Sequence, residues 1–358
     1  MTPPVPVVIV GAGLMGRWHA YYATRAGAEI AAIVDRQPRA AAALGAKYPH
    51  ARVFADLPSC LAQVETAAIH ICTPTASHVP LAAAALHAGV HVLLEKPVAA
   101  TRVETERLLA LARDRGVLLA PVHQFPFQRG VRRARRSLAQ LGALVRVAYV
   151  TCTVGGEGLA GPARRELLLE ILPHPVSLFH AFLGDEAGEI AWDLLELTDD
   201  GLELRGRLAG VRLHALLSLR GRPTRNTLTV YGTRGTVHAN LYHGYALIET
   251  GEPSRRTKLL QPFAHGTSLL ASAGANLAQR ALRAEPAYPG LPELIASFYR
   301  EVAQGSPAPI GEAEMLAAAS LIDRLRAQAA SSGSPRAAPL PLPGLGAGCP
   351  LGGGVGGG

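Results

Sequence analysis

The stretch VVIVGAGLMG, residues 7–16, decides the fold. Its apolar, β-branched run is typical of a buried strand and stops at three glycines with the spacing G-x-G-x-x-G, Gly11, Gly13 and Gly16. In a strand–turn–helix unit the first glycine permits a sharp turn, the second lets the backbone approach a pyrophosphate, and the third lets the helix pack on the strand. The N–H groups of the helix's first turn, at Leu14 and Met15, then face an anion. This context predicts a dinucleotide site, and a turn that binds no nucleotide is the alternative.

An acidic residue follows the next strand-like run, EIAAIVD (29–35). Asp35 stands about 20 residues after Gly16, which is the spacing of a carboxylate that binds the ribose 2′-hydroxyl. A carboxylate there repels a 2′-phosphate, so the sequence favours NAD. Arg36 beside it offers a partner for that phosphate, so NADP stays possible.

Strand and helix patterns alternate from residue 6 to about 120. Alternating β and α units predict a parallel, doubly wound sheet with right-handed crossovers. Gly89 and Gly116 are expected to end two of the helices with positive φ. The further strand-like runs are 67–73, 90–96 and 117–122, and the clearest helical stretches are 78–89 and 103–116.

The pattern changes after residue 140. Residues 202–220 and 226–241 alternate apolar and polar residues, which predicts antiparallel strands with one solvated or interface face. Gly232 and Gly235 are expected to form a tight turn between two of them. Two helical stretches follow, and from about residue 331 the chain is Pro/Gly-rich and predicted to be disordered.

The expected fold class is therefore α/β, with two domains and a tail. Residues 1–122 form a dinucleotide-binding Rossmann domain. Residues 123–330 form a C-terminal α/β domain for substrate and oligomerisation, with an open, largely antiparallel sheet. Residues 331–358 form the Pro/Gly-rich tail.

Composition narrows the class of protein. The chain has 358 residues, 49% of them hydrophobic and 17% charged, which is typical of a globular protein with two domains. Its longest apolar run falls short of the ~20 residues of a membrane-spanning helix, and no basic segment precedes the first strand as in a signal peptide. The cysteines are scattered, without metal or disulfide spacing, so we expect a cytoplasmic protein without a bound metal. They are Cys60, Cys72, Cys152 and Cys349.

Arginines supply most of the net charge of +8. The densest cluster lacks the interleaved aromatics of a nucleic-acid-binding surface, so no nucleic-acid partner is expected. It is either a solvated helix face or a surface that attracts an anionic substrate, such as a phosphorylated or nucleotide-linked sugar. The cluster comprises Arg129, Arg132, Arg133, Arg135 and Arg136.

A second constellation lies in CTPTASHVPLAAAALHAGVHVLLEKPVA, residues 72–99. Its Thr73-Pro74 turn, His78, Ala88-Gly89 helix end and Glu95-Lys96-Pro97 signature resemble the Gfo/Idh/MocA family of NAD(P)-dependent sugar and polyol oxidoreductases. Weaker likeness extends over residues 5–328. The resemblance implies that Thr73, Pro74, His78, Glu95, Lys96 and Pro97 lie at the cofactor. His78 either reaches the nicotinamide ribose or only starts a helix.

Lys96 is the expected catalytic residue. It ends a strand at the sheet's carboxyl edge, where doubly wound folds bind ligands. There its amine can polarise a substrate hydroxyl or exchange a proton with it. The resemblance implies a cis Lys96–Pro97 bond that aims the amine into the cleft. A surface lysine at a strand end is the alternative.

Oxidation of an alcohol also needs a group that accepts the hydroxyl proton. The resemblance implies an Asp-x-x-x-His pair, and RELLLEILPHPVSLFHAFLGD offers Glu170 and His174. On a regular helix that spacing puts both on one face. Pro173 and Pro175 disturb this expectation, because a helix that begins only at Pro175 leaves His174 near its N-terminus. There the helix dipole favours a neutral imidazole, which suits a general base. Glu166 competes with Glu170 as partner.

The segment 121–130 follows the last predicted strand of the first domain. Pro126-Phe127 stands where relatives often carry Arg-Phe, while His123 and Gln124 are candidate substrate contacts. We therefore expect an oxidoreductase that moves a hydride between a sugar, polyol or nucleotide-sugar hydroxyl carbon and the nicotinamide. The alternatives are a dinucleotide-binding regulator without turnover and an NAD-dependent glycosidase with transient oxidation. A homo-oligomer, dimer or tetramer, is expected through the period-two strands.

Overall fold

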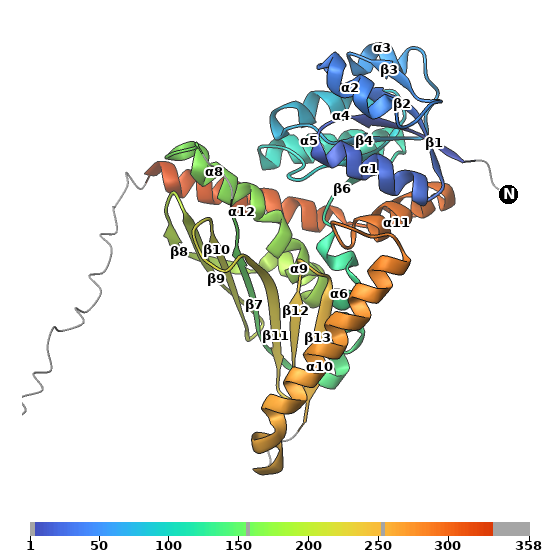
Figure 1. The fold of residues 1–358 in the computed structure, drawn as a ribbon. Coiled ribbons are helices and arrows are strands. Elements are labelled where there is room, and N and C mark those ends of the chain that lie inside the picture. The colour runs from blue at the N-terminus through green and yellow to red at the C-terminus, as the bar shows by residue number, and fades with distance from the viewer. Residues whose placement is uncertain (1–3, 155–157, 252–254, 332–358) are drawn as a thin grey trace, which may run out of the picture.

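Two sheets, each packed against helices, build the protein (Figure 1). The computed structural model describes residues 4–154, 158–251 and 255–331. Its architecture confirms the predicted fold class, a parallel Rossmann sheet followed by a largely antiparallel sheet. Of the predicted tail only Ser331 is described, at the end of a helix, and the remainder lies outside the described residues. Among the described residues no helix is long and apolar enough to cross a membrane.

The first domain contains a six-stranded sheet in the order β3-β2-β1-β4-β5-β6, with every pair parallel. Its central strands are buried almost throughout, as expected of a parallel sheet. Gly89 and Gly116 follow helices with φ of +74° and +65°, as predicted. The elements are β1 Val5–Val10, α1 Leu14–Arg25, β2 Ala28–Val34, α2 Pro38–Gly45, β3 Arg52–Phe54, α3 Leu57–Leu61, β4 Ala68–Ile71, α4 His78–His87, β5 His91–Leu94, α5 Arg102–Arg115 and β6 Leu119–Pro121.

The parallel order brings together the segments singled out from the sequence. β1, β4, β5 and β6 are neighbours, so their carboxyl ends meet at one edge of the sheet. The glycine turn follows β1, Thr73-Pro74 follows β4, Lys96 follows β5, and His123 follows β6. This edge is where doubly wound sheets bind ligands.

The second sheet has seven strands in the order β13-β12-β11-β7-β10-β9-β8. All its pairs are antiparallel except β7 with β10. One face packs against α6, α8, α9 and α12 in a hydrophobic core, which explains the period-two pattern. The strands are β7 Leu144–Cys152, β8 Ala191–Leu197, β9 Gly201–Leu208, β10 Val211–Ser218, β11 Arg225–Gly232, β12 Gly235–Asn240 and β13 Tyr245–Thr250. The helices that follow β6 are α6 Arg129–Arg136, α7 Leu138–Leu141, α8 Pro162–Ile171, α9 Pro173–Leu183, α10 Arg255–Leu282, α11 Leu291–Gln304 and α12 Glu312–Ser331.

The predicted turn between Gly232 and Gly235 joins β11 to β12, but neither glycine adopts positive φ. A Cβ on Gly232 would lie 2.2 Å from the carbonyl oxygen of Leu141. Glycine is therefore required here for the close approach of α7.

The chain returns to the first domain after the second sheet. Leu291, Leu294, Ile295 and Phe298 of α11 belong to the Rossmann core. Tyr22 of α1 also donates a hydrogen bond to the carbonyl of Ala287 (2.5 Å). α12 then lies across the boundary between the domains and contributes to the second core (Figure 1). We therefore propose that the Rossmann unit comprises residues 4–122 together with 291–315, in place of a single cut at residue 122.

Candidate active site

The glycine turn has the geometry that a diphosphate needs. Gly11 has φ +97°, and a Cβ on Gly16 would lie 1.8 Å from the Gly11 carbonyl oxygen, so both positions require glycine. A Cβ on Gly13 would meet nothing within 4 Å. α1 begins at Leu14 without a side-chain cap, so the N–H groups of Leu14 and Met15 point out of its N-terminus beside this open space.

Asp35 supports the glycine turn from the end of β2. One carboxylate oxygen accepts a hydrogen bond from the Ala12 N–H (2.7 Å), and the other accepts one from the Gln37 N–H (2.8 Å). Each oxygen keeps a further lone pair for a ribose hydroxyl. Arg36, the next residue, is exposed.

Two turns at the sheet edge are joined by His78. Its Nδ1 lies 2.8 Å from the Pro97 carbonyl oxygen and its Nε2 lies 2.8 Å from that of Thr73, and the side chain is buried. Because both ring nitrogens face backbone carbonyls, we propose that His78 positions these turns instead of contacting the nicotinamide ribose. Thr73 also accepts a hydrogen bond from the Ser77 hydroxyl (2.8 Å), and Pro74 lies between them in the sequence.

Glu95 begins a row of buried polar side chains that contact one another in turn. The Glu95 carboxylate is 3.3 Å from His19 Nε2, His19 Nδ1 is 3.0 Å from His70 Nδ1, and His70 Nε2 is 2.8 Å from the Tyr299 hydroxyl. Glu95 also accepts the Lys96 N–H (3.2 Å). Burial raises the pKa of Glu95, but the hydrogen bond from His19 and the charges of His19 and Lys96 outweigh it, so the pKa falls below 4.5. A carboxylate therefore fixes the backbone at the base of Lys96.

The sequence patterns did not predict this row of polar side chains. His19 and His70 are 51 residues apart, and Tyr299 is a further 229 residues from His70. Each histidine alone is typical of a satisfied core residue. The only sequence signal was the presence of polar residues at core positions of a helix and a strand.

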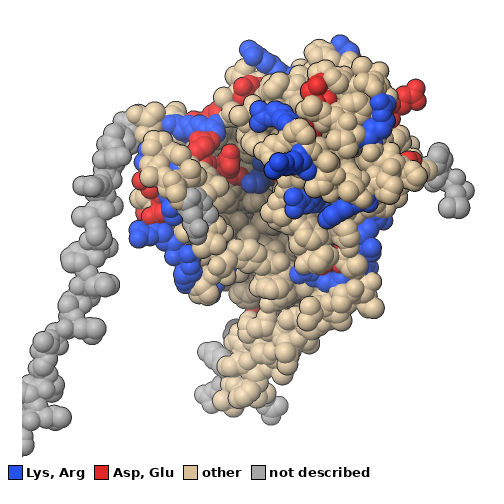
Figure 2. Space-filling model, turned by 45° about the horizontal axis from the view of Figure 1, so that its top comes forward, with Lys and Arg blue, Asp and Glu red and all other residues tan. Residues whose placement is uncertain are grey.

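Lys96 lies where the two domains meet. Its half-buried side chain extends from the end of β5, and Nζ donates a hydrogen bond to the Glu170 carbonyl of α8 (3.2 Å). The Lys96–Pro97 peptide bond is cis. The Glu170 carboxylate accepts a hydrogen bond from the Thr75 hydroxyl (3.2 Å). Figure 2 shows the surface hollowed between the two domains, with acidic and basic side chains at the rim.

The two candidate carboxylates do not orient His174. α8 ends at Ile171 and α9 begins at Pro173, so His174 lies in the first turn of α9, and that helix begins earlier than Pro175. Glu170 reaches Thr75, and Glu166 forms an ion pair with Arg326 of α12. In the part of the chain that the structure describes, neither carboxylate hydrogen bonds His174. The prolines remove the N–H groups that would continue α8 into α9, which is the physical reason.

His174 is nevertheless suited to act as a proton acceptor. Its ring stacks on Phe125 with centroids 4.4 Å apart, and Nδ1 is buried without a hydrogen-bond partner among the described residues. Burial, followed by the positive charges of Lys96 and His123, holds the pKa of His174 well below 6.5. The imidazole is therefore neutral at neutral pH.

The two candidate substrate residues, His123 and Gln124, are both buried. His123 Nδ1 is 2.5 Å from a carboxylate oxygen of Glu314 in α12. Gln124 precedes the short 3₁₀ turn Phe125–Phe127 that carries the ring stacked on His174. Their role toward substrate stays a prediction.

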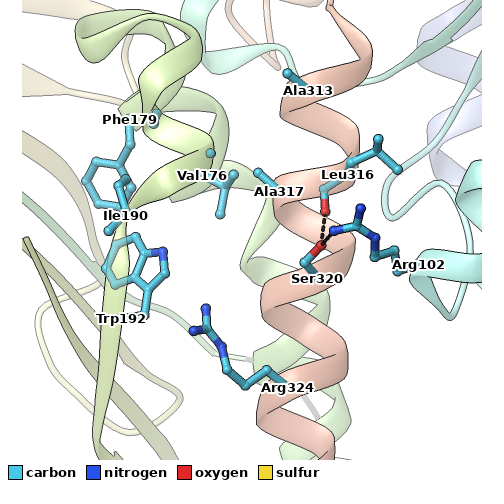
Figure 3. Close-up of a pocket in the computed structure, with 12 residues that line it drawn as sticks. Arg102, Val176, Phe179, Ile190, Trp192, Ala313, Leu316, Ala317, Ser320 and Arg324 are labelled. Carbon is cyan, nitrogen blue, oxygen red and sulfur yellow. Dashed lines mark hydrogen bonds between the residues drawn. The ribbon is translucent and has the colours of Figure 1, made fainter. Parts of the chain in front are cut away.

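A cavity of about 210 Å³ lies apart from these residues, between α9 and β8 on one side and α12 on the other. Trp192 and Phe179 line it opposite Ala317 and Arg324 of α12 (Figure 3). None of the residues lining it belongs to the glycine turn or to the Lys96 region. Arg102 Nη1 donates to the Ser320 hydroxyl there (2.7 Å), which ties α5 to α12. It is not part of the candidate active site.

The arginine cluster is divided between two roles. Arg129 pairs with Glu285 (2.7 Å) and Glu293 (3.2 Å), which anchors α6 beside α11. Arg132 and Arg135 line a second cavity, of about 380 Å³. Attraction of an anionic substrate by this cluster stays a prediction.

Acid is expected to destabilise the fold below about pH 6.5. Burial, with the charge of His19, holds the pKa of His70 well below 6.5, as burial does for His174. Between these lowered values and 6.5 the unfolded chain binds more protons than the folded one, so the free energy of unfolding falls as pH falls. The slope is about 1.4 kcal/mol per pH unit for each histidine held neutral. Urea unfolding at pH 7.5, 6.5 and 5.5 measures it.

The variant His70→Gln should flatten part of that slope, whereas His50→Gln at an exposed position should leave it unchanged. A free energy of unfolding that stays constant from pH 7.5 to 5.5 contradicts the assignment.

The fold and this edge of the sheet define a dinucleotide-binding protein of the Rossmann type. Residues 5–123 match the family model described as an oxidoreductase family with an NAD-binding Rossmann fold. This match confirms the resemblance to the Gfo/Idh/MocA family drawn from the sequence, over these residues.

Individual relatives match the same part of the chain. D-glucoside 3-dehydrogenase of Escherichia coli (strain K12) is 37% identical over 119 residues, 33% of this chain and 34% of the relative. UDP-N-acetylglucosamine 3-dehydrogenase of Acidithiobacillus ferrooxidans is 36% identical over 116 residues, 32% of this chain and 36% of the relative. The sequence matches thus span about a third of these curated relatives.

Solved structures extend the likeness in fold to both domains. The structure of the UDP-N-acetylglucosamine 3-dehydrogenase aligns with a TM-score of 0.70 at 18% identity, over 90% of this chain and 97% of that one. Levoglucosan dehydrogenase in complex with NADH and levoglucosan aligns with a TM-score of 0.71 at 16% identity, over 92% of this chain and 98% of that one.

Proposed function

We propose that this protein is an NAD(P)-dependent oxidoreductase that transfers a hydride between a sugar, polyol or nucleotide-sugar hydroxyl carbon and the nicotinamide. The observation that carries the proposal is the placement of the Lys96 amine at the carboxyl edge of the Rossmann sheet, 3.2 Å from the helix that precedes His174. The dehydrogenase names of the relatives support the reaction class, and their substrates support the sugar class.

The residues present fit a dinucleotide. Gly13 leaves open space beside the uncapped N-terminus of α1, where the Leu14 and Met15 N–H groups can bind a diphosphate. Asp35 offers carboxylate oxygens to the adenosine ribose. The turns after β4 and β5, pinned by His78, place Thr73 and Lys96 further along the same edge. When bound, the nicotinamide supplies the hydride acceptor or donor at C4.

The chain's own groups then manage the proton. In the oxidation direction the substrate hydroxyl donates its proton to the imidazole of His174, whose lowered pKa keeps it neutral. Nζ of Lys96 donates a hydrogen bond to the same substrate oxygen and stabilises the developing negative charge. The Glu95 carboxylate holds the Lys96 backbone, and the ring of Phe125 holds the His174 ring. In reduction the same groups return the proton.

The reaction is tested by mixing the protein with NAD or NADP and a panel of sugars, polyols, glycosides and nucleotide sugars. Net formation of the reduced cofactor, followed at 340 nm, is the expected result. Release of the aglycone without net reduction would show a glycosidase with transient oxidation. Cofactor binding with neither product across the panel would favour a regulator without turnover.

The protein is expected to prefer NAD(H) to NADP(H). The Asp35 carboxylate follows β2 beside the glycine turn, where it would meet the adenosine ribose and repel a 2′-phosphate. Replacing it in Asp35→Ser should lower the preference for NADH by about tenfold, about 1.4 kcal/mol. Fluorescence titration with NADH and NADPH measures both dissociation constants. Equal affinities for the two cofactors in the unaltered protein would contradict the role of Asp35.

We further propose a cytoplasmic location and a homo-oligomer, dimer or tetramer. The described cysteines, Cys60, Cys72 and Cys152, are unpaired, which supports a reducing compartment. The face of the second sheet that α6, α8, α9 and α12 leave uncovered supports association through that sheet.

A further inference from the structure

The long helix α10 carries large apolar side chains into solvent. Leu259, Phe263, Leu270 and Leu277 are 74%, 73%, 76% and 70% exposed. The helix packs along the edge strand β13 and extends past the ends of the strands (Figure 1). From 259 to 279 it contains no Asp, Glu, Lys or Arg, and the part of the lower projection that Figure 2 colours is tan. Exposed apolar surface of this extent marks an interaction site.

These four side chains form one stripe. Phe263, Leu270 and Leu277 recur every seven residues, and at 3.6 residues per turn they lie within about 40° of one another and of Leu259. The helix attaches to its own domain by a different face, because His265 Nδ1 bonds Glu249 (2.9 Å) and Asn276 donates to the His243 carbonyl (2.8 Å). The stripe is therefore free for a partner.

Small residues alternate with the large ones along the stripe. Gly266 and Ala273 stand between Phe263, Leu270 and Leu277, so that knobs and notches succeed each other in a heptad pattern. We name Leu259, Phe263, Gly266, Leu270, Ala273 and Leu277 the α10 seam. A Cβ on Gly266 would meet nothing within 4 Å, so its notch is open.

We propose that the α10 seam pairs with the same seam of a second copy of this chain in an antiparallel coiled coil. In one register Leu270 of each copy enters the notch at Gly266 of the other, Phe263 packs on Ala273, and Leu277 packs on Leu259. Every large side chain then meets a small one or an end leucine. An isologous pair with twofold symmetry results, which closes on itself.

Self-complementarity favours a second copy over other occupants. A helix that lies on a membrane surface carries Lys and Arg along its polar face, whereas those of α10 stand only at its two ends, at residues 255, 256, 258 and 280. Binding to a different protein would not require the seam to be complementary to a second copy of itself. Here three successive layers are complementary in a single register. The surface is distinct from the open face of the second sheet.

Sedimentation velocity of the full chain tests the pairing. Leu270→Glu places a charge in the central layer and should halve the mass of the assembly. Ala275→Glu, on an exposed part of the same helix away from the seam, should leave the mass unchanged. Circular dichroism checks that both variants are folded. A monomeric unaltered chain, or an unchanged mass in Leu270→Glu, would overturn the proposal. Flotation of a monomeric chain with phospholipid vesicles would point to a membrane surface instead.

Cysteine cross-linking tests the register. The double variant Phe263→Cys/Ala273→Cys should form a covalent dimer on mild oxidation, resolved on a non-reducing gel. Each single variant should not, because its cysteine faces the unaltered residue of the other copy. Cross-linking of the single variants to the same extent as the double variant would refute this register.

Discussion

Replacing Lys96 with methionine is expected to lower turnover by about 10²–10⁴-fold, the range for loss of a positioned proton-transfer group. Methionine keeps most of the length and apolar stem of lysine but removes the amine that lies 3.2 Å from the Glu170 carbonyl. Affinity for NAD(H) should survive within a few-fold, because the glycine turn and Asp35 are untouched. Single-turnover reduction of the cofactor with the substrate found in the panel measures the loss.

The matched control is Lys47→Met, which removes an exposed lysine in the same domain. It should turn over like the unaltered protein. A second readout is the pKa of His174, which burial and then the charge of Lys96 hold below 6.5. Loss of that charge should raise the pKa in an NMR titration. Undiminished turnover in Lys96→Met would refute the catalytic assignment.

Replacing Gly13 with valine is expected to weaken NAD(H) binding by about a hundredfold, about 2.8 kcal/mol. A Cβ there meets nothing within 4 Å, so the fold accommodates the side chain. The isopropyl group then occupies the space through which the backbone approaches the diphosphate. Fluorescence titration with NADH gives the affinity, and the thermal midpoint of the cofactor-free protein should be unchanged.

Substitutions at two other glycines distinguish a loss of cofactor binding from a loss of folding. Gly16→Val should unfold the domain, because even a Cβ would lie 1.8 Å from the Gly11 carbonyl oxygen. Gly188→Val, where a Cβ also meets nothing within 4 Å, should change neither affinity nor stability. Unaltered NADH affinity in Gly13→Val would contradict a dinucleotide at this turn.

Local patterns were sufficient to predict the parallel sheet. Its strands are short apolar runs, and alanine-rich helices with glycine ends separate them, so each element is encoded by its own residues. The three-residue β3 was missed because it is too short to show a period. α10 was missed because its apolar stripe faces away from the core, and the return of α11 to the Rossmann core depends on contacts between residues far apart in the chain.

The sequence predicted those parts of the candidate site whose motifs directly follow strands of the parallel sheet. The glycine turn, Asp35 and Lys96 each follow a strand of the same parallel sheet, so topology alone brings them together. The pairing of Glu170 with His174 rested on a regular helix, and Pro173 interrupts that helix. The hydrogen bonds of His78 and the row of polar side chains from Glu95 to Tyr299 depend on tertiary packing, which no local pattern records.

The most direct test of the account is a crystal structure of the protein with NADH bound. We expect the diphosphate oxygens about 3 Å from the N–H groups of Leu14 and Met15, and the Lys96 amine beside the nicotinamide ring. A dinucleotide bound elsewhere, or a nicotinamide remote from that amine, would contradict the account.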